Sequence, residues 1–169
     1  CPDMVDYEGE FSIVIGQWCH NATPKEAKAC IGGYTLINDV SARNWNVPGS
    51  KEPDWEYIHM GKQLPTFCPM GPTVVTADEI PNPDNVHLVT KLNGQVMQDA
   101  NTDDLVHPVA EMLSHFSKWY PFAPGDVITT GSPSGVGFAR KPPVFLKAGD
   151  QVSIHVQQIG ELTNPVVGP

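Results

Sequence analysis

The sequence predicts a mixed, mainly β fold with one long helix and one short helix. The first observation behind this prediction is a set of 15 glycines and 17 prolines, which are scattered along the 169 residues rather than clustered. Such punctuation is typical of many short strands joined by turns. The second is that segments with apolar residues at every other position outnumber segments with helical spacing. We therefore expect one globular domain over residues 1–169.

The first strand is predicted over residues 8–15. Phe11, Ile13 and Ile15 fall on one face of this strand, and the residues between them fall on the other face. The other face carries Glu8, Glu10, Ser12 and Val14.

A short helix is predicted to start at Thr23. The Thr23 side chain can cap the helix, Pro24 suits its first turn, and Glu26 completes a capping box. Because two glycines follow, we expect this helix to end near Gly32 and Gly33.

The remaining strands are predicted between turn signals. Asn93-Gly94 is a strong two-residue hairpin signal, Pro69 to Pro72 is predicted as a turn, and Pro48 to Pro53 as a polar loop. The strands are expected at residues 34–38, 73–76, 86–92, 127–130 and 152–156.

The long helix is predicted over residues 104–119. Apolar residues recur there at helical spacing and should face the core: Leu105, Val109, Met112, Leu113 and Phe116. This is the only stretch in which such a pattern extends over several turns, so the sequence predicts one helix packed on a strand-rich body.

Composition excludes several classes of protein. The net charge of -9 argues against a nucleic-acid partner, which would need a basic patch. No stretch of 18 apolar residues exists, so we expect no membrane association, and no signal peptide is visible. The four cysteines lack CxxC spacing, which favours reduced thiols and a cytoplasmic location over a disulfide framework or a zinc site.

Glu8-Gly9-Glu10 is the sharpest chemical feature of the sequence. Side chains two apart on a strand point the same way, roughly 7 Å apart. Two carboxylates placed together beside an apolar strand repel each other and lose hydration, and a bound cation removes both problems. Oxygen ligands favour Mg²⁺, with Mn²⁺ or Ca²⁺ as alternatives. The simpler interpretation is an edge strand with both glutamates in solvent.

Asp39 is the third candidate ligand. It ends the apolar strand predicted at residues 34–38, where an acid is out of place unless it caps, pairs or binds a ligand. Arg43 follows closely and is the alternative, purely structural partner of Asp39. Three carboxylates at two neighbouring strand ends would make a site with open positions for water or substrate.

An ordered set of short blocks resembles the fumarylacetoacetate hydrolase family. Each block is weak alone, but their order and approximate spacing match over nearly the whole chain. The blocks are Asp6 to Glu10, Gly33 to Arg43, Gly61-Lys62, Thr66 to Pro72, Asn93-Gly94, Gln98, Asn101-Thr102, Pro124 to Ile128 and Thr130 to Gly137.

The resemblance implies a catalytic domain with the family's β-roll fold, often a homodimer. It implies that Glu8, Glu10 and Asp39 bind one divalent metal, usually Mg²⁺, and that Lys62 points into the site as a catalytic residue. The same resemblance implies that Ser132 helps to hold a small carboxylate substrate, and we expect Arg43 and Gly131 to be further substrate-binding residues. Lys62 also has a simple alternative, a solvated surface lysine.

The implied chemistry is a metal-stabilised enolate. A 2-oxo acid offers a carboxylate oxygen and a keto oxygen to the metal, which polarises the keto group. The first hypothesis is a hydrolase that cleaves a C–C bond in an acylpyruvate or β-diketo acid. The alternatives are a decarboxylase or isomerase of a 2-oxo or 2-hydroxydienoic acid, and a catalytically silent binding member.

Two departures from the family pattern bear on these hypotheses. Family hydrolases carry a histidine, often with a glutamate, on a lid segment upstream of the first acidic pair. Only seven residues precede Glu8 here, so we expect this N-terminal lid to be missing from the chain. In addition, Asn44 and Met97 replace a frequent Asp and a frequent Arg, which puts recognition of a second substrate carboxylate in doubt.

Overall fold

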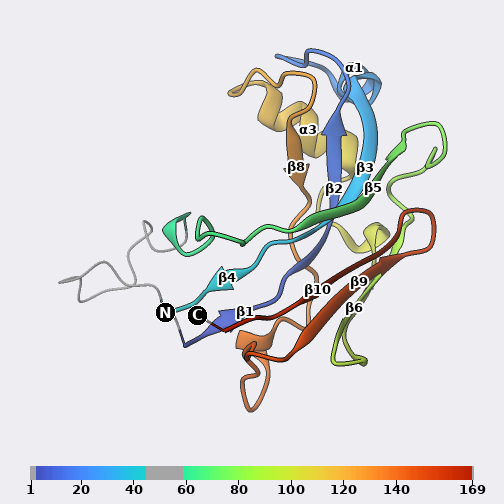
Figure 1. The fold of residues 1–169 in the computed structure, drawn as a ribbon. Helices are drawn as coiled ribbons and strands as arrows, with labels where there is room; N and C mark the ends of the chain where they lie inside the picture. Colours follow the sequence, from blue (N-terminus) through green and yellow to red (C-terminus); the bar gives the residue numbers. More distant parts are fainter. Residues whose placement is uncertain (1–2, 45–58, 169) are drawn as a thin grey trace.

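The computed structural model describes residues 3–44 and 59–168. In these ranges the chain forms two four-stranded antiparallel sheets, a two-stranded ribbon and few helices (Figure 1). The mixed, mainly β fold is therefore confirmed. The polar loop predicted at Pro48 to Pro53 lies outside the described residues.

The first sheet has the strand order β5-β3-β2-β8. Its strands are β2 (Gly9–Ile15), β3 (Ile31–Asn38), β5 (Met70–Thr76) and β8 (Val127–Thr129). β2 and β3 are antiparallel, with Gly9 opposite Asn38. The start of β2 therefore meets the end of β3, which brings the acids of the two strand ends to one place.

The second sheet has the order β10-β9-β6-β7. It consists of β6 (His87–Leu92), β7 (Gln95–Asn101), β9 (Gln151–Val156) and β10 (Gly160–Pro165). Asn93 and Gly94 form the predicted hairpin turn, with φ of 52° and 82°. β10 was not predicted, because only Leu162 in it is buried and apolar and the rest of the strand lies at a sheet edge.

The short helix α1 (Pro24–Cys30) starts as predicted. Thr23 accepts a hydrogen bond from the Glu26 N–H, and the Glu26 carboxylate accepts one from the Thr23 N–H, so the capping box is confirmed. The helix ends before the predicted Gly32 and Gly33, because β3 begins at Ile31 and draws both glycines into the sheet.

The longer helix α3 is shorter than predicted. It covers Val109–Ser117, after a 3₁₀ turn at Thr102–Asp104, and Pro108 is its N-cap residue. Proline has no N–H to donate and restricts the residue before it, which explains the late start. Among the described helices, none is long and apolar enough to cross a membrane.

The core lies between the two sheets and against the helices, which pack together at one end of the molecule (Figure 1). Val109 and Leu113 of α3 are fully buried, as predicted, but Phe116 is 40% exposed, so its predicted place in the core is wrong. Phe116 instead lines a cavity, together with Met112.

Two local structures near the site were not predicted. The turn predicted at Pro69 to Pro72 falls largely within β5, which includes a cis peptide bond between Gly71 and Pro72. A short ribbon joins β1 (Val5–Asp6) to β4 (Ser41–Ala42). This ribbon holds the segments just before Glu8 and just after Asp39 against each other.

A candidate metal and substrate site

Three acidic side chains converge where β2 begins and β3 ends. Carboxylate oxygens of Glu8, Glu10 and Asp39 lie within 4.8 Å of one another. The backbone fixes this arrangement, since the Asp39 N–H donates to the Glu8 carbonyl at 2.8 Å and the Glu8 N–H donates to the Asn38 side chain at 2.9 Å. The predicted convergence of the three acids is present in the structure.

The charges of this cluster are poorly hydrated. Glu8 is 7% exposed and Glu10 only 2%. Burial first, and then the nearby charges of Asp39 and Glu8, raise the pKa of Glu10 to about 7, against the opposing hydrogen bonds with Thr129 and the Gly131 N–H. A carboxyl group with this pKa is ready to exchange a proton for a cation near neutral pH.

Lys62 reaches into the acidic cluster. Its ammonium donates to Glu8 Oε2 at 2.9 Å, to Ser41 Oγ at 2.8 Å, and to Asp39. Burial alone would lower the pKa of Lys62, but the hydrogen bonds to Asp39 and Glu8 outweigh it and raise the pKa above its ordinary value. Lys62 is therefore a charged lysine within the cluster and not the solvated surface lysine of the simpler interpretation.

Arg43 supports Glu8. Its guanidinium donates to Asp6 Oδ2 from Nε at 3.1 Å and from Nη2 at 2.9 Å, and it also pairs with Glu8. Asp6 is fully buried and accepts further hydrogen bonds from the Gly137 and Phe138 N–H groups at 2.7 and 3.0 Å. Arg43 was the alternative partner expected for Asp39. In the structure Asp39 pairs with Lys62, and Arg43 pairs with Asp6 and Glu8.

The loop after β8 borders the acidic cluster. The Gly131 N–H donates to Glu10 Oε2 at 3.2 Å, and Gly131 has a φ of 87°, which favours glycine there. Gly131 and Ser132 also line a cavity of about 480 Å³. The wall of this cavity is mostly apolar and includes Phe11, Leu88, Leu105, Met112 and Phe116.

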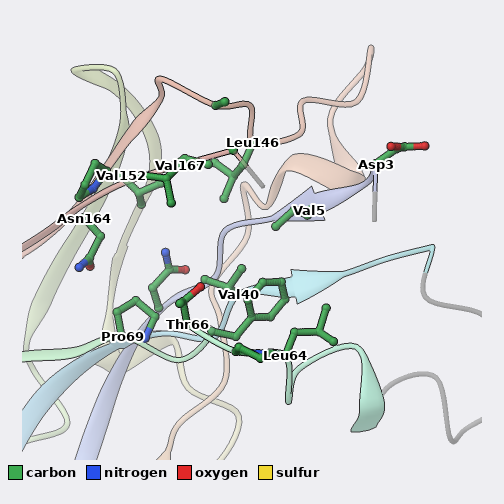
Figure 2. A pocket seen from close by; sticks show the side chains of 17 residues that line it. Asp3, Val5, Val40, Leu64, Thr66, Pro69, Leu146, Val152, Asn164 and Val167 are labelled. Atoms are coloured by element: carbon green, nitrogen blue, oxygen red, sulfur yellow. The ribbon is translucent and has the colours of Figure 1, made fainter. Parts of the chain in front are cut away.

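A larger apolar cavity lies apart from the acids. Its volume is about 810 Å³, and side chains from β1, from residues 64–69 and from the C-terminal segment point into it (Figure 2). Asn38 and Val40 line it, whereas Asp39 between them faces the acidic cluster. None of the three acids borders this cavity, so we place the chemistry at the acidic cluster.

Three supporting residues were quoted in the sequence pattern without an assigned role. Asp6 binds Arg43, Ser41 binds Lys62, and Gln98 hydrogen-bonds the backbone of Gly9. Asp6 lies two residues before Glu8 and Ser41 lies two residues after Asp39, so both positions gave a local signal. The partners of Gln98 are 89 and 35 residues away, so no local pattern indicates them.

The donor set of the cluster suits a hard divalent cation. It offers only carboxylate oxygens, which Mg²⁺, Mn²⁺ and Ca²⁺ prefer over softer metals. The Lys62 ammonium already joins Glu8 to Asp39, so the arrangement accommodates a positive charge between these two acids.

Several known proteins are similar to this chain in both sequence and fold. The sequence profile described as "Fumarylacetoacetate (FAA) hydrolase C-terminal" matches residues 1–167. The mitochondrial oxaloacetate tautomerase FAHD2A of Bos taurus is 41% identical over 163 residues, which are 96% of this chain and 51% of that protein. The chain thus spans about half the length of the curated relatives it matches.

Two solved structures show the same fold with different reactions. The 5-carboxymethyl-2-hydroxymuconate delta-isomerase of Mycobacterium smegmatis has a TM-score of 0.84 and 42% identity, covering 98% of this chain and 60% of that one. The maleylpyruvate hydrolase of Sphingobium sp. SYK-6, solved with manganese(II) and pyruvate, has a TM-score of 0.82 and 31% identity, covering 97% and 55%. On the profile, the relatives and the fold together, the chain belongs to the fumarylacetoacetate hydrolase family.

Proposed function

We propose that this chain is a divalent-metal-dependent enzyme that forms the enolate of a small 2-oxo acid. The observation that carries the proposal is the meeting of three carboxylates within 4.8 Å beside a charged lysine. The Mn²⁺ and pyruvate named in the maleylpyruvate hydrolase structure support both the kind of metal and the kind of ligand.

Glu8, Glu10 and Asp39 would hold the cation in this proposal. When bound, such a cation polarises the keto oxygen of a 2-oxo acid and stabilises the negative charge that develops on it. Arg43 keeps Glu8 in place through its pairs with Asp6 and Glu8. Mg²⁺ remains our proposed physiological metal, with Mn²⁺ as the alternative.

Lys62 would supply the second positive charge. Its ammonium sits beside Glu8 and Asp39, where it can hold a proton near the substrate oxygens and stabilise the enolate electrostatically. Arg43, Gly131 and Ser132 stay our proposed substrate-binding residues. The Gly131 N–H donates to the Glu10 carboxylate, and Arg43 pairs with the Glu8 carboxylate. Any contact of Gly131 or Arg43 with the substrate would therefore be made close to the cation.

Tautomerisation or isomerisation is the net reaction we favour. Both need only removal of a proton beside the keto group and its return, and a bound cation together with the Lys62 charge would stabilise the enolate between these two steps. The names of an oxaloacetate tautomerase at 41% identity and of a delta-isomerase at 42% identity support this choice. Decarboxylation of the same kind of substrate shares the first step and differs in its product.

Hydrolysis of a C–C bond is the second candidate. The maleylpyruvate hydrolase supports it, at 31% identity. This reaction needs a group that activates water in addition to the enolate-forming residues. A homodimer and a cytoplasmic location complete the proposal as expectations for the working protein.

Product analysis separates these reactions. The protein with Mg²⁺ or Mn²⁺ would be given oxaloacetate and an acylpyruvate, and the products followed by absorbance and NMR. Keto–enol exchange without fragments is the expected result; two acid fragments indicate hydrolysis, and CO₂ release indicates decarboxylation. Ligand binding without any turnover would mean a silent binding member, and activity that survives both metal removal and Glu10→Ala would reject the proposal.

A further inference from the structure

Gln98 of β7 connects two parts of the site without touching the acids. It is 1% exposed, and both ends of its side-chain amide are hydrogen-bonded. Oε1 accepts from the Gly9 N–H at 3.0 Å, and Nε2 donates to the Pro133 carbonyl at 3.0 Å. A backbone N–H can only donate and a carbonyl can only accept, so these partners fix the orientation of the amide.

The contact with Gly9 replaces a missing strand partner. β8 pairs with β2 only along Ser12 to Val14, and the first residue after β8, Thr130, reaches no further than Phe11. The Gly9 N–H points to the same edge of β2, beyond the end of β8. An unpaired buried N–H would be unfavourable. The side-chain oxygen of Gln98 therefore accepts the hydrogen bond of the Gly9 N–H, which lies between the two glutamates.

The contact with Pro133 closes a ring around the site. Pro133 lies two residues after Gly131, whose N–H donates to Glu10 Oε2 at 3.2 Å. Glu10 is in turn the neighbour of Gly9. The ring therefore runs from Gly9 through Gln98, Pro133, Gly131 and Glu10 back to Gly9, and Gln98 is the only side chain in it from the second sheet.

The loop beyond Pro133 is seated closely on the same part of β7. A Cβ atom on Gly135 would lie 2.1 Å from the Met97 carbonyl oxygen, and Gly135 has a φ of 108°. Arg140 donates to that same carbonyl. A shift of β7 at Met97 and Gln98 would thus be transmitted to the loop as well as to β2.

We infer that Gln98 is a positioning residue that sets the distance between the acidic strand segment and the Gly131–Ser132–Pro133 loop. This fixed spacing lets a cation on the acids and a carboxylate at the loop be bound together. The inference rests on the proposed function and deepens it, because it names a residue that coordinates the metal half of the site with the substrate half.

The test uses two substitutions of Gln98 that affect its two hydrogen bonds differently. Gln98→Met keeps the side-chain length and removes both bonds. Gln98→Glu keeps an acceptor for the Gly9 N–H and, when ionised, has no proton for the Pro133 carbonyl. Gln95→Met and Gln95→Glu are the matched controls, because Gln95 is exposed on the same strand.

Three quantities would be measured at pH 8. They are the affinity for Mn²⁺ by electron paramagnetic resonance, the affinity of the Mn²⁺-loaded protein for oxalate by calorimetry, and hydrogen exchange at the Gly9 amide of the metal-free protein. Oxalate is the probe because its two carboxylates imitate the chelating oxygens of an enolised 2-oxo acid.

Different outcomes are expected for the two variants. Gln98→Met should weaken Mn²⁺ binding about 10- to 100-fold, as for other residues that orient metal ligands, and should speed exchange at Gly9. Gln98→Glu should leave Mn²⁺ binding and Gly9 exchange close to those of the unchanged protein, but weaken oxalate binding about tenfold for the lost hydrogen bond. A general loss of stability would move both affinities together and would not produce this split.

Unchanged affinities for Mn²⁺ and oxalate in both Gln98 variants would overturn the inference. If Gln98→Met does not fold, Gln98→Glu decides alone: its oxalate affinity is measured from pH 6 to pH 10, and an affinity that does not fall as the new carboxyl loses its proton contradicts the positioning role. If the unchanged protein binds no Mn²⁺, the proposed function fails, and the exchange rate at Gly9 still judges the role of Gln98. Exchange that is equally slow in the unchanged protein and in Gln98→Met would then refute it.

Discussion

The buried charge of Glu10 lowers the stability of the metal-free protein, whereas the proposed metal site needs that charge. Burial raises its pKa to about 7, from an ordinary value of 4.5. The folded metal-free protein therefore holds the Glu10 proton more tightly than the unfolded chain does. Stability contributed by this group falls as the pH rises from about 4.5 to about 7, since the folded state must then either keep the proton or bury a charge.

Glu10→Gln should stabilise the metal-free protein at high pH. Glutamine imitates the protonated carboxyl, so the gain should be near zero at pH 4.5 and on the order of 3 kcal/mol above pH 7. Urea unfolding at several pH values measures it, with Glu111→Gln as an exposed control. A gain that does not change with pH, or a loss at pH 8, would contradict the assigned burial of the Glu10 charge.

Lys62 has one role without a metal and another with it. In the metal-free protein its ammonium neutralises Glu8 and Asp39. Lys62→Met should therefore lower the melting temperature of the metal-free protein, and Mn²⁺ should restore it by replacing the lost charge. Turnover should remain about 10²- to 10³-fold reduced, because the electrostatic help for the enolate is gone.

The Lys62 experiment has a matched control in Lys147→Met, which removes an exposed lysine far along the chain. Calorimetry with and without Mn²⁺, together with steady-state rates, provides the readout. A variant that turns over substrate at the normal rate would show that Lys62 is a structural counter-ion alone.

At the scale of elements, β2 depends on the absence of a side chain at Gly9. A Cβ atom there would lie 2.1 Å from Thr90 Oγ1 and 3.2 Å from Gln98 Oε1. Gly9→Ala should destabilise the protein by about 1–3 kcal/mol through overpacking, and should weaken metal binding because the flanking glutamates move with the strand. Denaturant unfolding and Mn²⁺ titration measure the two effects.

Thr90 provides the rescue for this substitution. Its buried hydroxyl has no hydrogen-bond partner among the described residues, so Thr90→Ala removes the clash without removing a bond. The double variant Gly9→Ala/Thr90→Ala should recover part of the lost stability and metal affinity. If the two substitutions simply add, the close approach of the second sheet is not what requires glycine at this position.

Elements with local signals were predictable, and elements made by distant partners were not. The capping box at Thr23 and the turn at Asn93-Gly94 are short-range chemistry, and both are present in the structure. β10 and the ribbon between β1 and β4 form only because a partner strand lies beside them. The late start of α3 reflects Pro108, whose effect outweighed the apolar spacing upstream of it.

The same division holds within the site. The convergence of Glu8, Glu10 and Asp39 could be predicted, because an acid on each of two successive strands meets at one end when the strands are antiparallel. The ion pairs of Arg43 with Asp6 and Glu8 could not, since the sequence equally allowed a pair with Asp39. The hydrogen bond between Gln98 and Gly9 depends on how the second sheet packs on the first, and no short sequence pattern indicates that packing.

At the scale of the whole molecule, the two sheets make different contributions to the site. The first sheet carries the acids at the start of β2 and the end of β3. The second sheet packs against this segment through Thr90 and Gln98. The loop after β8 joins the two parts at Gly131 and Pro133. Because several parts of the chain contribute, loss of tertiary packing should remove metal binding and catalysis together.

Direct titration of the protein with Mn²⁺ tests the central claim, followed by electron paramagnetic resonance. We expect one tightly bound ion per chain, displaced by Mg²⁺, and no such ion in Glu8→Gln, Glu10→Gln or Asp39→Asn proteins that remain folded. Binding of Mn²⁺ by all three variants as tightly as by the unchanged protein would contradict the account, because the ion would then lie elsewhere.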